Sequence, residues 1–445
     1  MTYVRAQLIK LLGWLRASWI ATTFPREKRA RRALVVGLLW ALLASGSIVP
    51  LPPAPVTEGP GAEATPTVTA TPAQTVLAEG TGTPTAVQDV YQQWLPMVVQ
   101  DPSPTPTATP TVTHTPEPTA TPTPAPTPAL TPTPVPWPEP LEVPGYSRLG
   151  LHVQWNNSPE IMEFIRRMKP AVVKALDDLG FLQEVKQASP ATIIVARLSV
   201  PQPTDGDPEA QARAFVANNL PTYLEHPAVD YWEGYNEPDV QGKMDWYARF
   251  EAARVRAMAE HGLKCAIGSF STGVPELEAF QHFLPAIQAA RAHGGVLSLH
   301  EYDAPIMDRS IGTSLPGLPG RPDRGTLTLR YRWWYEDILI PQGLEIPLVI
   351  TEAGVDGLVG NRPGPADGRG WQDFAEYWSE QYPGHSALEV YVEQLAWYDH
   401  EVQKDPYVLG WALFTAGPLG PQWQSYDVTD QLRYIAWEIL VPQAR

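Results

Sequence analysis

The stretch "VDYWEGYNE", residues 229–237, is a short apolar run that ends in polar residues. Other runs of the same kind recur along the chain, with amphipathic segments of helical periodicity between them. These are "RLGLHVQW" (148–155), "AVVKALD" (171–177), "TIIVARLS" (192–199), "KCAIGSFS" (264–271), "VLSLHEYD" (296–303), "PLVITEAG" (347–354) and "VLGWALFT" (408–415). Eight strand–helix units with nearly continuous apolar strands predict an α/β protein, a single (β/α)8 TIM barrel over residues 146–445.

A doubly wound open sheet is the alternative to this barrel. That fold needs a glycine-rich phosphate turn after its first strand. The sequence there, "HVQWNNSPE" (152–160), contains no glycine. The barrel is therefore the favoured prediction.

Polar residues lie near the carboxyl ends of the predicted strands. One such residue is commonly a cap, but nearly every run ends in this way. In a barrel these ends meet at one face, where the loops build the active site. The residues are His152, Lys174, Arg197, Glu237, Ser269, His300, Tyr302 and Glu352.

Two of these residues are carboxylates that suit glycoside cleavage. Glu237 ends the fourth predicted strand and Glu352 ends the seventh, so both could face the barrel mouth. One carboxylic acid can protonate the leaving group while the other carboxylate attacks the anomeric carbon. A separation of ~5 to 5.5 Å gives retention of configuration, and ~6.5 to 9.5 Å gives inversion.

Three motifs give a specific resemblance. "WEGYNEPD" (232–239) resembles the fourth-strand signature of the clan A retaining glycoside hydrolases, a superfamily that includes families 5 and 39. "VITEAG" (349–354) resembles the seventh-strand nucleophile motif, and "LHEYD" (299–303) resembles the sixth strand. The motifs fall in the expected order, and the likeness covers residues 146–445.

The resemblance implies a role for each matching residue. Glu237 would be the general acid/base and Glu352 the nucleophile. Asn236 would hydrogen-bond the sugar 2-hydroxyl, Tyr302 would orient Glu352, and His300 would line the sugar site. No cofactor is implied, and His152 is a further candidate for substrate binding.

The sequence departs from the superfamily pattern at two strands. The usual arginine near the end of the second strand is missing, so Lys174 or Arg197 would have to replace it. The usual tryptophan at the end of the eighth strand is also missing, and Phe414 or Trp411 would take its place.

Other residues have plainer interpretations. Glu233 is expected to form hydrogen bonds deeper in the barrel, and strand alternation should turn Glu301 away from the site. His152, His300 and Asp303 lack the tight spacing of a metal motif, so no metal site is predicted. In the loop after the seventh strand, either sugar stacking or packing against the barrel would explain the aromatics Trp371, Tyr377 and Trp378.

The charge distribution excludes some partners. The chain has a net charge of −16, of which residues 1–32 contribute about +7 and the remainder about −23. Binding of nucleic acid needs a basic surface, so no nucleic acid partner is expected. A carbohydrate substrate fits better, and the barrel is expected to be monomeric. The single cysteine, Cys265, excludes an internal disulfide.

The N-terminal part reads as a targeting segment followed by a stalk. A basic region, 1–32, precedes an apolar run, 33–49, which predicts a cytoplasmic N-region and then a signal peptide or membrane anchor. Residues 50–145 hold about half of the chain's 50 prolines, so a disordered Thr/Pro-rich linker is expected, with an apolar island at 90–100. The barrel would then be secreted or held at the cell surface.

These features favour an exported glycosidase, while two rivals remain open. A barrel without catalytic activity could bind glycan at the cell surface, although such a binder has no need of a matched acid and nucleophile. An enzyme of another chemistry could also use this fold. The sequence does not decide the sugar, the linkage, or exo against endo cleavage.

Overall fold

The computed structural model describes residues 135–142 and 144–443. The predicted N-region 1–32, the apolar segment 33–49, the island 90–100 and the linker as far as residue 134 lie outside the described residues. No helix within the described ranges is both long enough and apolar enough to cross a membrane.

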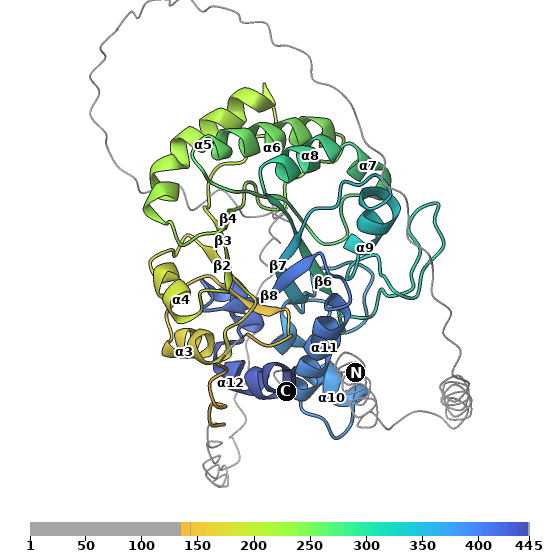
Figure 1. The fold of residues 1–445 in the computed structure, drawn as a ribbon. Helices are drawn as coiled ribbons and strands as arrows, with labels where there is room; N and C mark the ends of the chain where they lie inside the picture. Colours follow the sequence, from red (N-terminus) through yellow and green to blue (C-terminus); the bar gives the residue numbers. More distant parts are fainter. Residues whose placement is uncertain (1–134, 143, 444–445) are drawn as a thin grey trace, which may run out of the picture. The chain divides into compact units, whose positions relative to one another are not determined.

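Eight parallel strands form one sheet in the order β4-β3-β2-β1-β8-β7-β6-β5, with helices around its outer side (Figure 1). The predicted (β/α)8 barrel is therefore confirmed. The strands are β1 (Leu149–Val153), β2 (Val172–Leu176), β3 (Ile193–Arg197), β4 (Tyr231–Trp232), β5 (Ala266–Phe270), β6 (Val296–Asp303), β7 (Leu348–Val355) and β8 (Val408–Ala416).

Helices follow the strands, and local signals begin several of them. The Ser158 side chain accepts a hydrogen bond from the Glu160 amide at the start of α3, and Ser386 and Glu389 form a capping box at the start of α11. The helices are α3 (Pro159–Met168), α4 (Leu182–Ala188), α5 (Pro208–Glu225), α6 (Met244–Ala259), α7 (Leu277–Gln281), α8 (Leu284–Ala292), α9 (Tyr331–Trp334), α10 (Ala375–Gln381), α11 (Ala387–Val402), α12 (Leu432–Ile435) and α13 (Val441–Gln443). Short π-helical segments are η2 (Tyr335–Leu339) and η6 (Ala436–Leu440). Short 3₁₀-helical segments are η3 (Trp371–Phe374), η4 (Pro421–Tyr426) and η5 (Thr429–Gln431).

The barrel closes between β4 and β5 through few backbone contacts. Trp232 forms a single parallel bridge with Cys265, and its amide donates to the Lys264 carbonyl at 2.9 Å. The buried guanidinium of Arg254 on α6 completes this seam, because it donates to the carbonyls of Trp232 (3.1 Å) and Ala266 (2.8 Å). Arg254 is in turn paired with the buried carboxylate of Glu251 at 2.7 Å.

The barrel interior has an apolar layer with polar residues above it. Alternate residues of a strand share one face, so Val172 lies on the same face as Lys174, and Val296 on the same face as Ser298 and His300. The lower positions pack as one small apolar cluster: Val172, Val195, Ala266, Val296, Val349 and Ala412. This stacking in layers is usual for TIM barrels, and it leaves the polar ends of the strands at the mouth.

The end of the proline-rich segment packs on the barrel. Trp437 donates its indole N–H to the Pro136 carbonyl at 2.8 Å, and the Leu141 amide donates to the Arg167 carbonyl at 2.8 Å. The Trp137 ring lies 6.5 Å from the Phe164 ring. The packed part of the chain therefore begins before residue 146, the start that the composition suggested. Composition gives no sign of contacts that only a few side chains make.

Arg254 offers a test of how the barrel is closed. Arg254→Met should lower the free energy of unfolding by about 3 to 5 kcal/mol, because it leaves the Glu251 carboxylate buried without its partner. Urea unfolding followed by tryptophan fluorescence measures this change. The matched control is Arg249→Met, which removes an exposed pair with Glu209 and should cost less than about 1 kcal/mol. Equal effects of the two variants would contradict this role for Arg254.

Candidate active site

Two different local structures carry the candidate carboxylates. Glu352 is a residue of β7 and lies opposite His300 of β6 in the sheet register. Glu237 lies five residues beyond the last residue of β4, Trp232. It has a φ of 42°, and its amide donates to the Ser269 carbonyl at 2.9 Å. A non-glycine residue in this left-handed region is uncommon and is found preferentially at functional sites.

The predicted fourth strand, which was expected to end at Glu237, is therefore too long. Pairing stops at Trp232, and the chain then passes close to α6. A side chain at Gly234 would come within 2.7 Å of the Glu251 carboxylate. The need to pass over the Glu251–Arg254 pair redirects the backbone, and an apolar pattern alone does not reveal this constraint.

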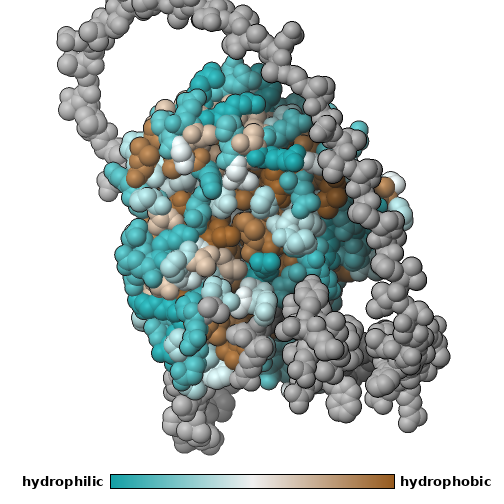
Figure 2. Space-filling model, viewed as in Figure 1, coloured by the Kyte–Doolittle hydropathy of each residue, from teal (hydrophilic) through white to brown (hydrophobic). Residues whose placement is uncertain are grey.

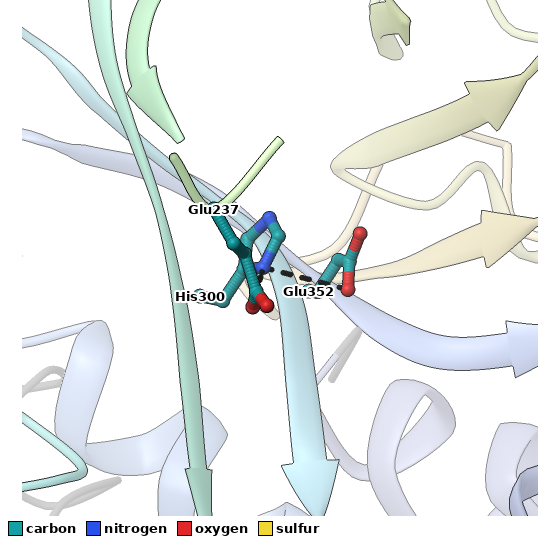
Figure 3. Close-up of side chains that lie close together, drawn as sticks. All are labelled: Glu237, His300 and Glu352. Atoms are coloured by element: carbon teal, nitrogen blue, oxygen red, sulfur yellow. Dashed lines mark hydrogen bonds and ion pairs between the residues drawn. The ribbon is translucent and has the colours of Figure 1, made fainter. Parts of the chain in front are cut away.

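His300 lies between the two carboxylates (Figure 3). Its Nδ1 is 2.7 Å from Oε1 of Glu237 and 3.5 Å from Oε2 of Glu352. One oxygen of each carboxylate and one nitrogen of His300 all lie within 4.8 Å of one another. The fold thus brings together residues 115 positions apart in the sequence, as the strand ends predicted.

Glu352 is the more enclosed of the two carboxylates. Its side chain is 9% exposed, against 35% for Glu237. The Tyr302 hydroxyl donates to its Oε2 at 3.0 Å, while Arg197 Nη1 lies 3.5 Å and His152 Nε2 3.7 Å from its Oε1. Several donors therefore surround Glu352, and this environment favours its ionised form.

A buried ionic network lies directly beneath the two candidate carboxylates. Lys174 donates to Oε2 of Glu233, and both side chains are fully buried. The hydroxyls of Ser298 and Thr351 donate to the other oxygen of Glu233 at 2.5 and 2.7 Å. Glu233 is therefore an interior residue, as its sequence context predicted, and Lys174 contacts it rather than the open mouth.

Burial and nearby charges shift the pKa of each ionisable group. Burial raises the pKa of Glu352, but its interactions with His300, Arg197 and Lys174 outweigh burial, and the net shift is downward. Burial likewise raises the pKa of Glu237, but the hydrogen bond from His300 turns the net shift downward. Burial lowers the pKa of His152 to about 3, so this imidazole is neutral at neutral pH. Both carboxylates are thus ionised in the free site.

The remaining predicted binding residues differ in position. Phe414 packs 4.8 Å from the His152 ring and 6.0 Å from the Tyr302 ring, so it lines the site. Asn236 directly precedes Glu237, and its buried Oδ1 has no hydrogen-bond partner among the described residues.

Trp411 does not lie at the site, so its predicted role in binding is wrong. It is fully buried, and its indole donates to Asp399 of α11 at 2.8 Å. Strand alternation places it on the outer face of β8, opposite to the face of Ala412.

The loop aromatics and Glu301 serve packing. Trp371 stacks on Tyr391 at 5.0 Å, and the Trp378 indole donates to the Pro305 carbonyl at 3.0 Å. Glu301 points away from the site, as predicted, and accepts hydrogen bonds from the amides of Leu329 and Arg330.

The structure adds three residues that sequence reasoning missed. Trp423 and Tyr426 of η4 pack against Phe414 at 5.3 and 5.4 Å. Tyr426 donates to Asp356, the residue that follows β7, at 2.7 Å. The stretch "GPQWQSYD" (420–427) could have indicated Trp423 and Tyr426, because aromatic residues in a loop after a barrel strand lie at the active face.

Glu237, His300 and Glu352 are also residue types that bind metal ions. Here His300 Nδ1 is engaged with Glu237 at 2.7 Å, and Arg197 places a positive charge 3.5 Å from Glu352. A bound cation would have to break the first contact and be repelled by the second. The geometry therefore suits an acid/base pair better than a metal centre.

Comparisons with known proteins identify relatives in fold. No family model matches the chain, and no curated protein matches it. Among solved structures it is similar to a family 39 glycoside hydrolase from Bacteroides cellulosilyticus WH2, with a TM-score of 0.44, 12% identity, and coverage of 66% of this chain and 64% of that one. The chain thus spans less than two thirds of that protein's length.

Two further solved structures are similar. One is a family 128 exo-β-1,3-glucanase from Aureobasidium namibiae, with a TM-score of 0.37, 12% identity, and coverage of 67% and 98% of the two chains. The other is an endo-β-1,4-mannanase from Thermotoga petrophila, with a TM-score of 0.38, 10% identity, and coverage of 67% and 77%. At these identities the likeness concerns the barrel fold alone.

The buried neutral His152 predicts a pH dependence of stability. Its pKa is below the unfolded value of about 6.5, so the unfolded chain binds the additional proton. The free energy of unfolding should therefore fall by about 2 kcal/mol from this residue between pH 7.5 and pH 5. Urea unfolding at both pH values should show that His152→Gln removes this part of the fall. The control variant His261→Gln, at an exposed site, should keep it. An unchanged slope in His152→Gln would contradict the assignment.

Proposed function

We propose that the protein hydrolyses O-glycosidic bonds of a β-linked oligo- or polysaccharide with retention of anomeric configuration. The observation that carries this proposal is the pair of carboxylates at the barrel mouth, where one oxygen of each lies within 4.8 Å of the other. This separation suits a nucleophile and an acid/base, because inversion needs carboxylates about 6.5 to 9.5 Å apart with a water between them.

Glu352 is the nucleophile in this proposal. Its carboxylate oxygen forms a bond to the anomeric carbon while the bond from that carbon to the leaving oxygen breaks, and Glu237 gives its proton to that oxygen. Glu237 then takes a proton from water, and the resulting hydroxide oxygen displaces Glu352 from the sugar. Two displacements at the same carbon restore its original configuration.

The environments of the two carboxylates support this division of roles. Glu352 keeps donors from Tyr302 and Arg197 when a sugar displaces water, so it can stay ionised. Glu237 is more exposed in the free site, and an uncharged substrate would desolvate it. Desolvation raises the pKa of a carboxyl group, so Glu237 is the one that takes up the proton as substrate binds.

The neighbouring residues have proposed roles in binding. Asn236 offers an unpaired amide oxygen to the sugar 2-hydroxyl, and this bond can strengthen in the transition state. Arg197 takes the place of the superfamily's arginine, since it contacts Glu352 directly. Neutral His152 also has a buried Nε2 without a partner among the described residues, and it can bind a sugar hydroxyl.

The sequence outside the barrel supports an extracytoplasmic location for the enzyme. A basic N-region, an apolar segment at 33–49 and a Thr/Pro-rich linker favour export, with the barrel outside the cytoplasm. If the apolar segment is not cleaved, it would hold the protein at the membrane. The barrel would then reach extracellular polymer at the end of its linker.

Substitution of the nucleophile tests the proposal. Glu352→Gln should abolish turnover of an activated aryl β-glycoside, because the amide cannot attack the anomeric carbon. Steady-state kinetics measures this, and circular dichroism verifies the fold. The matched control Glu380→Gln, on the surface of α10, should keep full activity. Undiminished turnover by Glu352→Gln would exclude this nucleophile, and glycan binding without any turnover in the unsubstituted protein would favour a binding module.

Substitution of Glu237 should give a different result. Glu237→Ala should lose about 10²- to 10⁴-fold in rate on a substrate with a poor leaving group, as expected for loss of a general acid/base. Azide should partly rescue it on a substrate with a good leaving group, by attacking the glycosyl-enzyme without base assistance. A β-glycosyl azide product, identified by NMR, would support retention. An α-glycosyl azide would contradict it.

A further inference from the structure

Exposed apolar side chains mark the loops at the barrel mouth. Large exposed apolar residues that follow strands are Trp155, Val274, Leu358 and Leu419, after β1, β5, β7 and β8. The face of the molecule in Figure 2 is hydrophilic over most of its area and carries separate apolar patches. Apolar side chains near a polar site are typical of a surface that binds a ligand.

The loops after β1 and β8 form one side of the mouth. The Leu419 amide donates to the Gln154 side chain at 2.6 Å. A side chain at Gly417 would come within 1.8 Å of the Trp155 carbonyl, so the two backbones touch. Trp155, whose side chain is about half exposed at 52%, therefore stands beside the loop that carries Trp423.

On this side, the side chains of Tyr302, Phe414, Trp423 and Tyr426 form an aromatic wall that begins next to the nucleophile. Tyr302, which donates to Glu352, meets the edge of Phe414 at 6.0 Å. Phe414 contacts Trp423 at 5.3 Å, and Trp423 contacts Tyr426 at 5.6 Å. These rings form a cluster of their own, separate from the main core. Trp423 is only partly buried, so one surface of the wall remains open to solvent.

Asp356 adds a polar group to this wall. Its Oδ1 accepts hydrogen bonds from the Tyr426 hydroxyl at 2.7 Å and the Leu358 amide at 2.8 Å. These two donors fix the carboxylate, and among residues 144–443 no hydrogen bond to its Oδ2 is found. Asp356 directly follows β7, the strand that carries Glu352.

We propose that Trp423, together with Asp356 held by Tyr426, forms a subsite for a second sugar ring on the glycone side of the cleaved bond. The inference rests on the proposed function. A pyranose presents an apolar face that can stack on an indole. Its hydroxyl pairs can donate to a carboxylate, and hydrogen bonds to a charged acceptor are the stronger ones.

The order of the strands indicates on which side of the cleaved bond the subsite lies. The leaving group must lie next to its proton donor, Glu237, which follows β4. The aromatic wall rises from β8, four places from β4 in the eight-stranded order and so on the opposite side. The wall therefore contacts the sugars that remain on Glu352 after the first step. The substrate class is a glycan with at least two linked sugars on that side, rather than a single terminal sugar.

Kinetics with matched substrates tests the subsite. The probes are aryl β-glycosides of glucose, mannose and xylose, each compared with the β-1,3- and β-1,4-linked disaccharide that bears the same leaving group. For at least one sugar, kcat/KM should be about tenfold or more higher for the disaccharide. Trp423→Ala should lower this preference roughly tenfold, because the disaccharide rate falls about ten times more than the monosaccharide rate.

Tyr426→Phe keeps the ring but removes one of the two donors that hold Asp356, so it should lower the preference by a smaller factor. The matched control is Tyr146→Ala, at an aromatic that is 80% exposed just before β1 and away from the mouth, which should leave the preference unchanged. Equal kcat/KM values for disaccharide and monosaccharide in the unsubstituted enzyme would overturn the subsite. An equal loss on monosaccharide and disaccharide in Trp423→Ala would also overturn it.

Complete inactivity on every probe would contradict the proposed function, and calorimetry then tests the subsite by itself. In that case the unsubstituted protein should bind a β-linked oligosaccharide, and Trp423→Ala should weaken this binding roughly tenfold. Binding of equal strength in the two proteins, or no binding to either, would overturn the subsite.

Discussion

The structure depends on one buried charge pair, between Lys174 and Glu233 at the centre of the barrel. Two charges without solvent are costly unless they are paired and fully hydrogen-bonded. Here Ser298 and Thr351 satisfy the second oxygen of Glu233. The donors come from β2, β6 and β7 and the acceptor from the segment after β4, so the network is satisfied only when these strands have closed around it.

The same network supports the candidate catalytic groups above it. Arg197 Nη1 lies 3.9 Å from Glu233 and 3.5 Å from Glu352, so one guanidinium contacts both layers. His300 contacts both mouth carboxylates, but Tyr302 donates only to Glu352. The two glutamates therefore differ in donors as well as in exposure. Such a difference in environment is what assigns acid and nucleophile roles to residues of the same type.

The pattern of eight apolar runs was sufficient to predict the barrel, because parallel strands buried on both faces are apolar along their whole length. The motifs also singled out Glu237, His300 and Glu352, whose side chains the fold brings close together. Trp411 was assigned to the site wrongly, because it lies three residues before Phe414 and strand alternation places residues at an odd spacing on opposite faces of β8. The early end of β4 and the contribution of Asp356 depend on packing between distant segments, which no local pattern encodes.

The central claim is that Glu352 becomes covalently attached to the sugar. A 2-deoxy-2-fluoro glycoside with a good leaving group slows the second step more than the first if a glycosyl-enzyme forms, so the intermediate accumulates. The analogue is made for the sugar that is cleaved fastest, and peptide mass spectrometry locates the label. We expect one fluorosugar per chain, attached to Glu352. Attachment to another residue, or turnover that yields the inverted anomer, would contradict it.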